Sequence, residues 1–288
     1  MDPSVAAKSR SSVRPFLKWA GGKQWLAPIL EGVVPGIRGT YREPFLGGGA
    51  VFFRLRPSDA VLSDSNGLLV ETFQVVRDNV DALIDVLERY PHDQDFYEEM
   101  RKARPPSPLL RAARLIYLNK TAFNGLYREN GAGNFNVPFG SFRNPTICQP
   151  TRLRAASSAL RNVTVVADNY STAVSIAGQG DLVYLDPPYI TGHRDNGFRK
   201  YSAHLFTWDD HVDLAKQAEA AADRGAFVIA SNADHDDVAA LYPSFVRYRV
   251  DRSSLIGGGK SYRRGVSEAV FSSEELGEHD RLERVSNG

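Results

Sequence analysis

Residues 181–189 read Asp181-Leu182-Val183-Tyr184-Leu185-Asp186-Pro187-Pro188-Tyr189, an apolar run that ends in an acid, two prolines and a tyrosine. An apolar run of this length, starting just after Gly180, is typical of a buried strand in a parallel sheet. Proline cannot donate to a strand ladder and fixes φ near about −65°, so the strand must end at Pro187. We therefore predict an α/β fold with a parallel sheet, whose ligands bind where the strands end.

The turn after this strand presents hydrogen-bond acceptors beside an aromatic ring. The acceptors are the Asp186 carboxylate and the carbonyls of the proline pair, and the ring is that of Tyr189. Two acceptors next to an aromatic face suit a planar ring with an exocyclic NH2 group, which describes adenine or, less often, cytosine. Taken alone, the motif also fits a strand-ending turn with a solvated acid.

The composition is that of a globular protein without disulfides. The chain has 288 residues, of which 42% are hydrophobic and 24% charged. It contains no apolar run of about eighteen residues, and residues 1–12 lack the apolar core of a signal peptide, so we expect a cytoplasmic protein without membrane contact. Cys148 is the only cysteine, which excludes internal disulfides, multi-cysteine zinc sites and the zinc deaminases. We predict no metal.

The charge is unevenly distributed, although the net charge is only +1. Residues 101–161 are rich in arginine and lysine and contain Glu129 as their single acid. A second basic stretch runs from Arg247 to Arg264 and is opposed only by Asp251. Two such stretches suggest one face that binds a polyanion, with solvated helix faces as the alternative.

The first half of the chain has the pattern of a nucleotide-binding unit. A predicted strand at residues 40–44 leads into the loop Gly47-Gly48-Gly49 and then into an apolar helix start. A second predicted strand, residues 60–63, is followed by Asp64, an acid suited to gripping ribose hydroxyls. Phe52 stands where the dinucleotide fingerprint has its third glycine, so we expect a nucleoside-like cofactor without a pyrophosphate. A purely structural turn is the alternative for the glycine loop.

Helices and strands alternate in the rest of the chain, around a helical, basic insertion. Predicted helices cover residues 24–30, 66–90, 109–120 and 211–224, and further predicted strands cover residues 163–167, 226–230, 245–250 and 266–271. The last two strands are predicted to pair antiparallel around Gly257-Gly258-Gly259.

Two Asn-Gly pairs flanked by aromatic residues predict a hairpin after residue 123. Arg128 lies beside the tip, and both it and Asn124 could contact the edge of a base, because arginine to guanine is the commonest specific pairing. An ordinary surface hairpin is the alternative for this stretch by itself.

Five motifs in this order resemble the Dam-type adenine-N6 DNA methyltransferases, the α group of the D12 class, in which the cofactor motif precedes the recognition domain and the catalytic motif follows it. Each motif alone is weak, but their combination over residues 16–271 is highly specific. The motifs are Leu17-Lys18-Trp19-Ala20-Gly21-Gly22-Lys23, Glu43-Pro44-Phe45-Leu46-Gly47-Gly48-Gly49, Asn124-Gly125-Leu126-Tyr127-Arg128, Phe135-Asn136-Val137-Pro138-Phe139-Gly140 and Asp186-Pro187-Pro188-Tyr189.

The resemblance implies three groups of site residues. It implies an S-adenosylmethionine pocket lined by Trp19, Lys23, Phe45, Gly47, Asp64, Asp168 and Asp186, with Asp64 on the ribose and Asp168 near the cofactor adenine. It implies a catalytic turn formed by Asp186, Pro187, Pro188 and Tyr189. It implies recognition of double-stranded DNA, typically at GATC, through Lys18, Phe123, Asn124, Leu126, Arg128, Pro138 and Phe142.

The resemblance also implies a domain organisation. We expect a Rossmann-like S-adenosylmethionine-dependent methyltransferase domain formed by residues 14–67 and 150–271, into which a mainly helical DNA target-recognition domain with a β-hairpin, residues 68–149, is inserted. Residues 1–13 should be a disordered tail and residues 272–288 a flexible, frayed tail. No obligatory protein partner is predicted.

The expected reaction is methyl transfer to the N6 atom of an adenine that has been flipped out of the duplex. Asp186 and a proline carbonyl would accept the two amine hydrogens, Tyr189 would stack on the base, and Asp186 would act as an acceptor or proton sink rather than as a nucleophile. Alternatives are a cytosine-N4 or RNA-directed methyltransferase, a non-catalytic DNA-binding relative and, more weakly, a nicotinamide-dependent enzyme.

Overall fold

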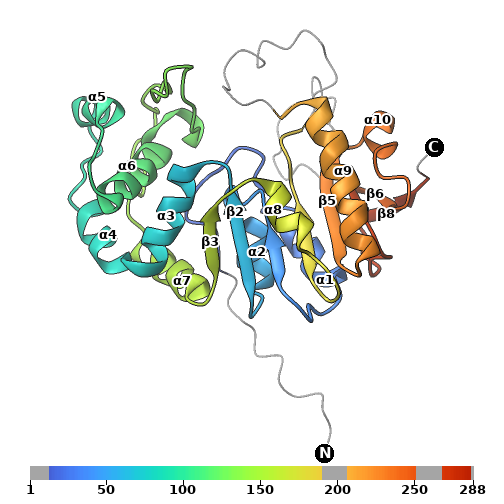
Figure 1. Ribbon diagram of the computed structural model, residues 1–288. Coiled ribbons are helices and arrows are strands. Elements are labelled where there is room, and N and C mark those ends of the chain that lie inside the picture. The colour runs from blue at the N-terminus through green and yellow to red at the C-terminus, as the bar shows by residue number, and fades with distance from the viewer. Residues whose placement is uncertain (1–12, 190–205, 251–267, 287–288) are drawn as a thin grey trace, which may run out of the picture.

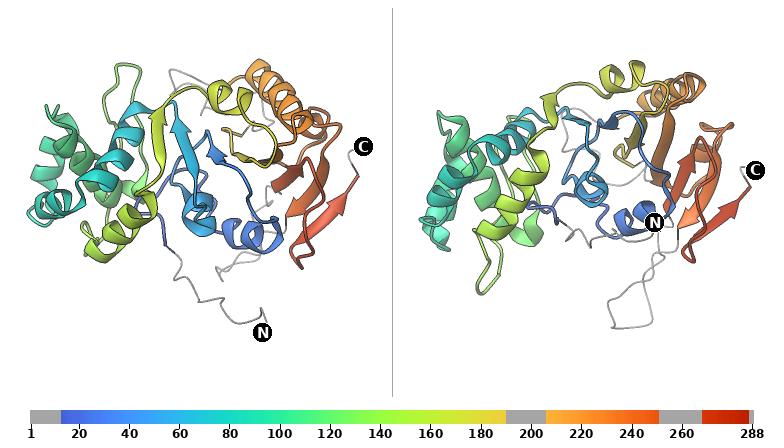
Figure 2. Two further views of the ribbon diagram at one scale, coloured as in Figure 1. Left: turned by 60° about the horizontal axis from the view of Figure 1, so that its bottom comes forward. Right: turned by 90° about the horizontal axis from the view of Figure 1, so that it is seen from below.

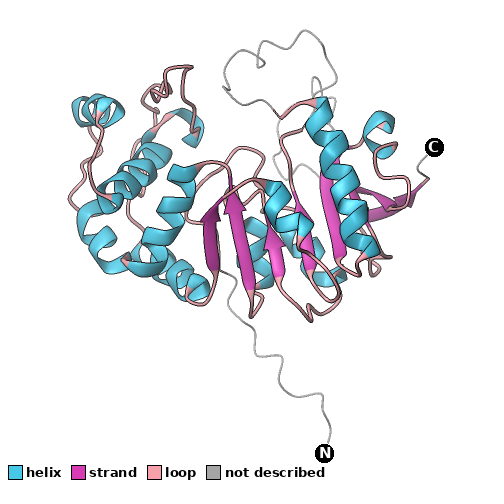
Figure 3. Ribbon diagram, viewed as in Figure 1, coloured by secondary structure: helices cyan, strands magenta, loops and turns pink. Residues whose placement is uncertain are grey.

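The computed structural model, which describes residues 13–189, 206–250 and 268–286, is built on one eight-stranded sheet. Five strands are parallel and the other three form an antiparallel end, as Figures 1 and 3 show. Across the sheet the order is β3 (Thr164–Ala167), β2 (Ala60–Asp64), β1 (Tyr41–Glu43), β4 (Leu182–Leu185), β5 (Phe227–Ala233), β7 (Glu268–Ser272), β6 (Val246–Val250) and β8 (Leu282–Val285). The predicted α/β class is confirmed.

The direction of travel through the sheet reverses between β1 and β4. From β1 the chain moves outward to β2 and β3, and it then returns to β4, which pairs with the other edge of β1. A crevice forms at the carboxyl ends of the strands where such a reversal occurs, because the two connections leave in opposite directions. The turn that follows β4 lies at this point.

Helices cover both faces of the sheet, and the side chains of β4 alternate between them. Leu182 and Tyr184 belong to the core shared with α1 (Ala27–Val33), α2 (Ala50–Leu55) and α3 (Gly67–Asp78). Val183 and Leu185 belong to the core shared with α8 (Tyr170–Ser175), α9 (Trp208–Asp223) and α10 (Asp236–Ala239). All four strand residues are buried, so the three-layer arrangement explains the continuous apolar run.

A second group of helices lies on the β3 side of the sheet, away from the antiparallel strands (Figures 1 and 2). It consists of α4 (Val80–Leu87), α5 (Gln94–Lys102), α6 (Pro108–Thr121) and the short 3-10 turn η1 (Phe123–Gly125), and α7 (Pro150–Leu160) leads back to β3. α5, α6 and the segment after η1 share a small core of their own, which contains Tyr97, Tyr117, Leu118, Ala122, Phe135 and Val137. Within the described residues, no helix is both long and apolar enough to cross a membrane.

Two predicted elements differ from the structure. The helix predicted over residues 66–90 is two helices, because the chain leaves helical geometry at Asn79 (φ −136°, ψ 36°). α3 packs on β2 and β3, whereas α4 packs on α6 and α7. The segment 272–288, predicted to fray, contains β8, which pairs with the outer edge of β6. This segment is held because the Leu276 amide donates to the Tyr248 hydroxyl at 2.8 Å. The glycine loop 257–259 lies outside the described residues.

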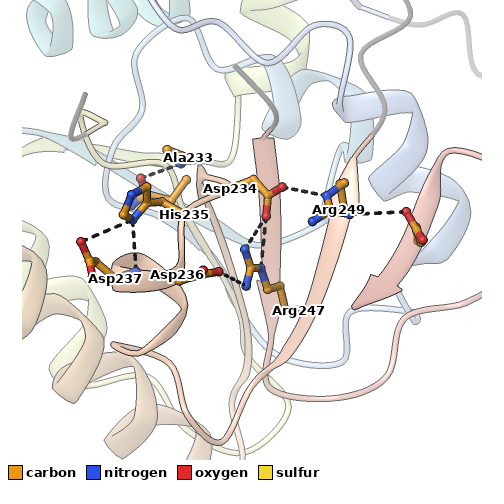
Figure 4. Close-up of polar contacts among 9 residues, drawn as sticks. Ala233, Asp234, His235, Asp236, Asp237, Arg247 and Arg249 are labelled. Carbon is orange, nitrogen blue, oxygen red and sulfur yellow. Dashed lines mark hydrogen bonds and ion pairs between the residues drawn. The ribbon is translucent and has the colours of Figure 1, made fainter. Parts of the chain in front are cut away.

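Several arginines of the two basic stretches hold the fold together instead of facing a partner. Arg247 is 5% exposed and its Nη2 lies 2.6 Å from Asp234, whose other carboxylate oxygen accepts from Arg249 at 2.8 Å (Figure 4). Arg114, buried in α6, donates to the carbonyls of Met100 and Arg101. The two stretches suggested one polyanion-binding face, and the buried Arg114 and Arg247 cannot belong to such a face. Residues 251–267 of the second stretch lie outside the described part of the chain.

A buried carboxyl group joins β1 to the helix that follows the glycine loop. Glu43, the last residue of β1, accepts from the Tyr41 hydroxyl at 2.8 Å and from the Phe52 amide at 3.1 Å. Burial raises the pKa of Glu43 to about 8, although both hydrogen bonds oppose the shift. The carboxyl group is thus protonated in the folded protein over a pH range in which it would ionise in water.

We expect Glu43→Gln to reduce the pH dependence of stability. The pKa of Glu43 is higher in the folded than in the unfolded chain. Its contribution to the free energy of unfolding is therefore complete below about pH 4.5 and is lost as the pH rises to about 8. At roughly 1.4 kcal/mol per pKa unit, the wild-type free energy of unfolding should lose about 5 kcal/mol across this window through Glu43. Denaturant titrations at both ends of the window measure the difference.

The exposed acid Asp59 provides the control, and Asp59→Asn should keep the wild-type pH slope. Glutamine retains an oxygen that can accept from Tyr41 and Phe52, so Glu43→Gln differs from the wild type mainly in titration. A wild-type slope in Glu43→Gln would contradict the buried, protonated carboxyl.

Candidate active site

The carboxylate of Asp186 lies directly after β4, at the reversal point of the sheet. Its Oδ1 accepts from the Ser231 hydroxyl of β5 at 2.9 Å and lies 2.9 Å from the Nζ of Lys23. The Lys23 side chain is 4% exposed and that of Asp186 is 19% exposed, so the ion pair is largely removed from water but still reachable. Burial raises the pKa of Asp186, and Lys23 and Ser231 act against this shift by stabilising the ionised form.

Tyr189, at the end of the same turn, is fixed by a second carboxylate. Its hydroxyl donates to Oε2 of Glu268 on β7 at 2.9 Å, and the Nζ of Lys23 lies 4.5 Å from its ring centroid. The same Nζ is 3.8 Å from Glu268, so Lys23 stands between two carboxylates and beside an aromatic ring. Burial raises the pKa of the Tyr189 phenol, which stays neutral. The ring therefore has a defined orientation next to Asp186.

The glycine loop closes on the acid at the end of β2. The carboxylate of Asp64 accepts from the amide of Gly47 at 3.0 Å and from that of Asn66 at 2.9 Å, and burial raises its pKa. Gly47 has φ +47°, and a Cβ there would lie 3.0 Å from the indole of Trp19, so only glycine fits. Trp19 thus lies directly on the loop. Each oxygen of Asp64 keeps a second lone pair.

Asp168 lies beside Asp64, because its backbone amide donates to the Asp64 carbonyl at 3.2 Å. Its carboxylate accepts from the Asn169 amide at 2.7 Å and from the Thr172 hydroxyl at 3.1 Å, both at the start of α8. Asp64, the last residue of β2, and Asp168, the first residue after β3, therefore lie at the same edge of the sheet.

An aromatic group adjoins these acids. The ring centroids of Phe45 and Tyr170 are 5.6 Å apart and nearly parallel, and Phe206 meets both edge-on, at 5.6 Å from Phe45 and 5.5 Å from Tyr170. Only Phe45 was predicted from the sequence. Tyr170 and Phe206 carry no motif, but Tyr170 follows the predicted acid Asp168 by two residues, which is a signal that could have found it.

The residues assigned to DNA recognition gather on one surface around η1. The Phe123 amide donates to the Pro138 carbonyl at 2.9 Å, and the Nζ of Lys18 lies 5.1 Å over the ring of Phe142. Phe123 is 48% exposed and Leu126 is 41% exposed. Large apolar side chains exposed next to one another commonly mark an interaction site.

A buried asparagine joins this surface to the segment around residue 18. Asn119 of α6 accepts from the Lys18 amide at 2.9 Å and donates to the carbonyls of Lys18 and Gly125, at 2.6 and 3.0 Å. The Trp19 ring also stacks on Tyr127, with centroids 5.6 Å apart. The segment around residue 18 is therefore bound both to the glycine loop and to η1, although no motif had assigned a role to Asn119.

The predicted hairpin is short. Two antiparallel bridges join its described residues, Glu129 to Phe135 and Ala122 to Phe139, and the Asn136 amide donates to the carbonyl of Arg128 at 3.0 Å. The guanidinium of Arg128 donates from Nε to the side chain of Asn136 at 2.7 Å, and the residue is exposed. Asn124 is exposed and has φ +55°, a left-handed conformation that asparagine tolerates.

Tertiary contacts thus add partners that sequence reasoning missed. Ser231 and Glu268 bind the two polar groups of the turn, but they come from β5 and β7. Ser231 does follow a predicted strand, so its place at the carboxyl edge was available as a signal. Glu268 has no comparable signal, because it begins a strand that runs antiparallel to β5.

Comparison with a protein-family model gives a match over residues 19–255, and the family is described as the D12 class N6 adenine-specific DNA methyltransferases. The match contains the ion-paired Asp186 turn, the glycine loop and the surface around η1.

Individual proteins are similar along most of the chain. The Type II methyltransferase M1.LlaDCHI of Lactococcus lactis subsp. cremoris is 32% identical over 93% of this chain and 98% of its own length. The Type II methyltransferase M.MjaIII of Methanocaldococcus jannaschii is 34% identical over 90% and 98%. The DNA adenine methylase of Escherichia coli (strain K12) is 32% identical over 77% and 81%. The chain therefore belongs to the family of D12 class N6 adenine-specific DNA methyltransferases.

Proposed function

We propose that the protein transfers a methyl group from S-adenosylmethionine to N6 of an adenine flipped out of duplex DNA, within the sequence GATC. The observation that carries the proposal is the turn after β4. It combines a reachable carboxylate, Asp186, with an oriented aromatic ring, Tyr189, at the reversal point of the sheet.

The residues at the carboxyl ends of β1, β2 and β3 fit S-adenosylmethionine. The spare lone pairs of Asp64 suit the two ribose hydroxyls, and we assign the Asp168 carboxylate to the exocyclic amine of the cofactor adenine. Phe45 and Tyr170 supply an apolar wall for the adenine ring. When bound, the cofactor supplies a methyl group on a positively charged sulfur. We assign Trp19, Lys23 and Gly47 to the cofactor as well, since Trp19 contacts Gly47 and Lys23 pairs with Asp186.

The turn would bind the target amine in the geometry that transfer requires. Lys23 and Ser231 both contact Oδ1 of Asp186, so Oδ2 is the oxygen we assign to one N6 hydrogen, and the Pro187 carbonyl is assigned to the other. Both acceptors favour positive charge on the nitrogen as it becomes tetrahedral. Asp186 then receives the released proton. Flipping costs a few kcal/mol, part of which stacking on Tyr189 recovers.

The surface around η1 would read the DNA. Phe123, Leu126 and Pro138 offer apolar contacts, whereas Lys18, Asn124 and Arg128 offer donors to bases and phosphates. We assign target recognition to α4–α6 and the hairpin, with Phe142 supporting Lys18. We propose the end of α3 as the boundary in place of residue 68. Gln74 of α3 donates to the carbonyl of Val165 in β3 and Arg77 to the carbonyl of Val163, so α3 is tied to the sheet.

We expect label from S-adenosylmethionine to enter N6-methyladenine in duplex oligonucleotides that contain GATC, and not in GATG or GAT-free duplexes. Asp186→Ala should abolish transfer while duplex binding stays within about threefold, because the acceptor is lost and the recognition surface is not. Asp209→Ala, which removes an exposed acid of α9, should behave as wild type. Full activity of Asp186→Ala would exclude the mechanism. Transfer at another sequence would exclude only the assignment of GATC and would leave the reaction in place.

Arg128→Ala should relax discrimination at one guanine of the site. A bidentate arginine contact contributes about 1–3 kcal/mol, so the preference in kcat/KM for GATC over the duplex changed at that position should fall by about 5- to 150-fold. Arg161→Ala, an exposed arginine at the end of α7, should leave the preference unchanged. If both variants keep the wild-type preference, Arg128 does not read the sequence.

Phe45→Ala and Phe123→Ala should separate the two binding surfaces. Loss of the Phe45 ring should raise the Kd for S-adenosylmethionine by about tenfold, through lost stacking and apolar area, without changing the Kd for DNA. Phe123→Ala should raise the Kd for DNA without changing the Kd for S-adenosylmethionine. Calorimetry with each ligand measures both constants, and a similar effect of the two substitutions on cofactor binding would refute the assignment of Phe45.

A further inference from the structure

A histidine of α9 lies behind the catalytic turn. His211 is fully buried, and its Nε2 is 3.1 Å from the carbonyl oxygen of Pro188. On its other side, Nδ1 is 3.4 Å from the side-chain nitrogen of Asn232, which is also buried at the end of β5. The imidazole thus joins the turn after β4 to the neighbouring strand.

The partners determine which nitrogen of His211 carries the proton. A carbonyl can only accept, so Nε2 must donate to Pro188, and the amide nitrogen of Asn232 can only donate, so Nδ1 must accept. The amide of Asn232 is oriented by its oxygen, which accepts from the Ala233 backbone at 2.8 Å. Burial lowers the pKa of His211. The geometry therefore requires a neutral imidazole with its proton on Nε2.

The position of His211 is fixed by rigid neighbours. It lies in the first turn of α9, where Thr207 and Asp210 form a reciprocal capping box. Its ring meets that of Phe206 edge-on, with centroids 4.7 Å apart, and Phe206 in turn contacts Phe45 and Tyr170. His211 consequently connects the aromatic group with the catalytic turn, through Phe206 on one side and the Pro188 carbonyl on the other.

We propose that His211 is a positioning residue for methyl transfer, which holds the Pro188 carbonyl and so orients the Asp186–Tyr189 turn. The inference rests on the proposed function of that turn. The turn is then anchored at two points, the Pro188 carbonyl by His211 and the Tyr189 hydroxyl by Glu268. With the Pro188 carbonyl engaged from behind, the Pro187 carbonyl is the proline oxygen presented to the target amine. A displacement of the turn by about 1 Å would suffice to slow transfer strongly.

Two substitutions of His211 test this role. His211→Phe keeps a ring against Phe206 and removes both nitrogens, and we expect kcat for methyl transfer to fall by about 10- to 100-fold, with KM for DNA and for S-adenosylmethionine changed less than about twofold. His211→Gln keeps an N–H that can reach the carbonyl and should recover kcat to within about fivefold of wild type. Equal activity of the phenylalanine variant and the wild type would overturn the proposal.

His235→Phe is the matched control. His235 likewise bonds the backbone near a helix start, but there its ring accepts, from the Asp237 amide at 3.1 Å, and it is the exposed N-cap of α10 (Figure 4). It should retain wild-type kcat and KM. A change in His211→Phe that raised KM and lowered thermal stability, without lowering kcat, would indicate a purely structural role and overturn the proposal.

Nitrogen-15 NMR of the histidine rings in the wild-type protein provides a test that does not depend on a variant folding. We expect a neutral His211 with the proton on Nε2 at neutral pH, and a proton on Nδ1 would overturn the proposal. Asp186→Ala, measured in the methyl-transfer assay beside His211→Phe, distinguishes a failure of the proposed function from a failure of the role of His211. If it abolishes transfer while His211→Phe does not affect kcat, the proposed function stands and only the role of His211 fails.

Discussion

The site depends on how a carboxylate is stabilised at the end of a buried strand. Asp186 loses much of its hydration there, and the loss is offset by Lys23 at 2.9 Å and by the Ser231 hydroxyl at 2.9 Å. Lys23 is itself buried and lies near a second carboxylate, Glu268. The lost hydration is therefore offset only when four parts of the chain meet at one point: the N-terminal segment, β4, β5 and β7. Removal of one partner would leave an uncompensated charge away from water.

The same segment connects the sheet to α6 and η1. Lys23 follows the stretch in which Lys18 is held through its backbone by Asn119 and Trp19 lies between the glycine loop and Tyr127. Contacts to the sheet and to α6 thus come from residues only five positions apart. Such a connection ties the geometry of the Asp186 turn to that of the surface around η1, and the proposed function needs both to act on one DNA molecule.

Buried acids at the strand ends respond to their surroundings in different ways. Glu43 has a pKa near 8 because burial outweighs its two hydrogen bonds, and it acts as a neutral link between β1 and α2. Asp186 has a raised pKa as well, but a lysine is within ion-pair distance and its side chain is partly open to solvent. Residues of the same chemical type at the same edge of the sheet thus serve the fold in one case and, as we propose, the reaction in the other.

The sequence by itself determined the fold class, the strand that ends at Asp186 and the family, because apolar alternation, proline geometry and ordered motifs are properties of short stretches of chain. It did not determine the break at Asn79, the strand β8, or the loss of Arg247 and Arg114 from the charged surface. Nor did it identify Ser231, Glu268, Asn119 or His211. Each of these depends on which side chains from distant segments come within hydrogen-bonding distance, and only the tertiary structure decides that, because burial and pairing arise when the layers pack together.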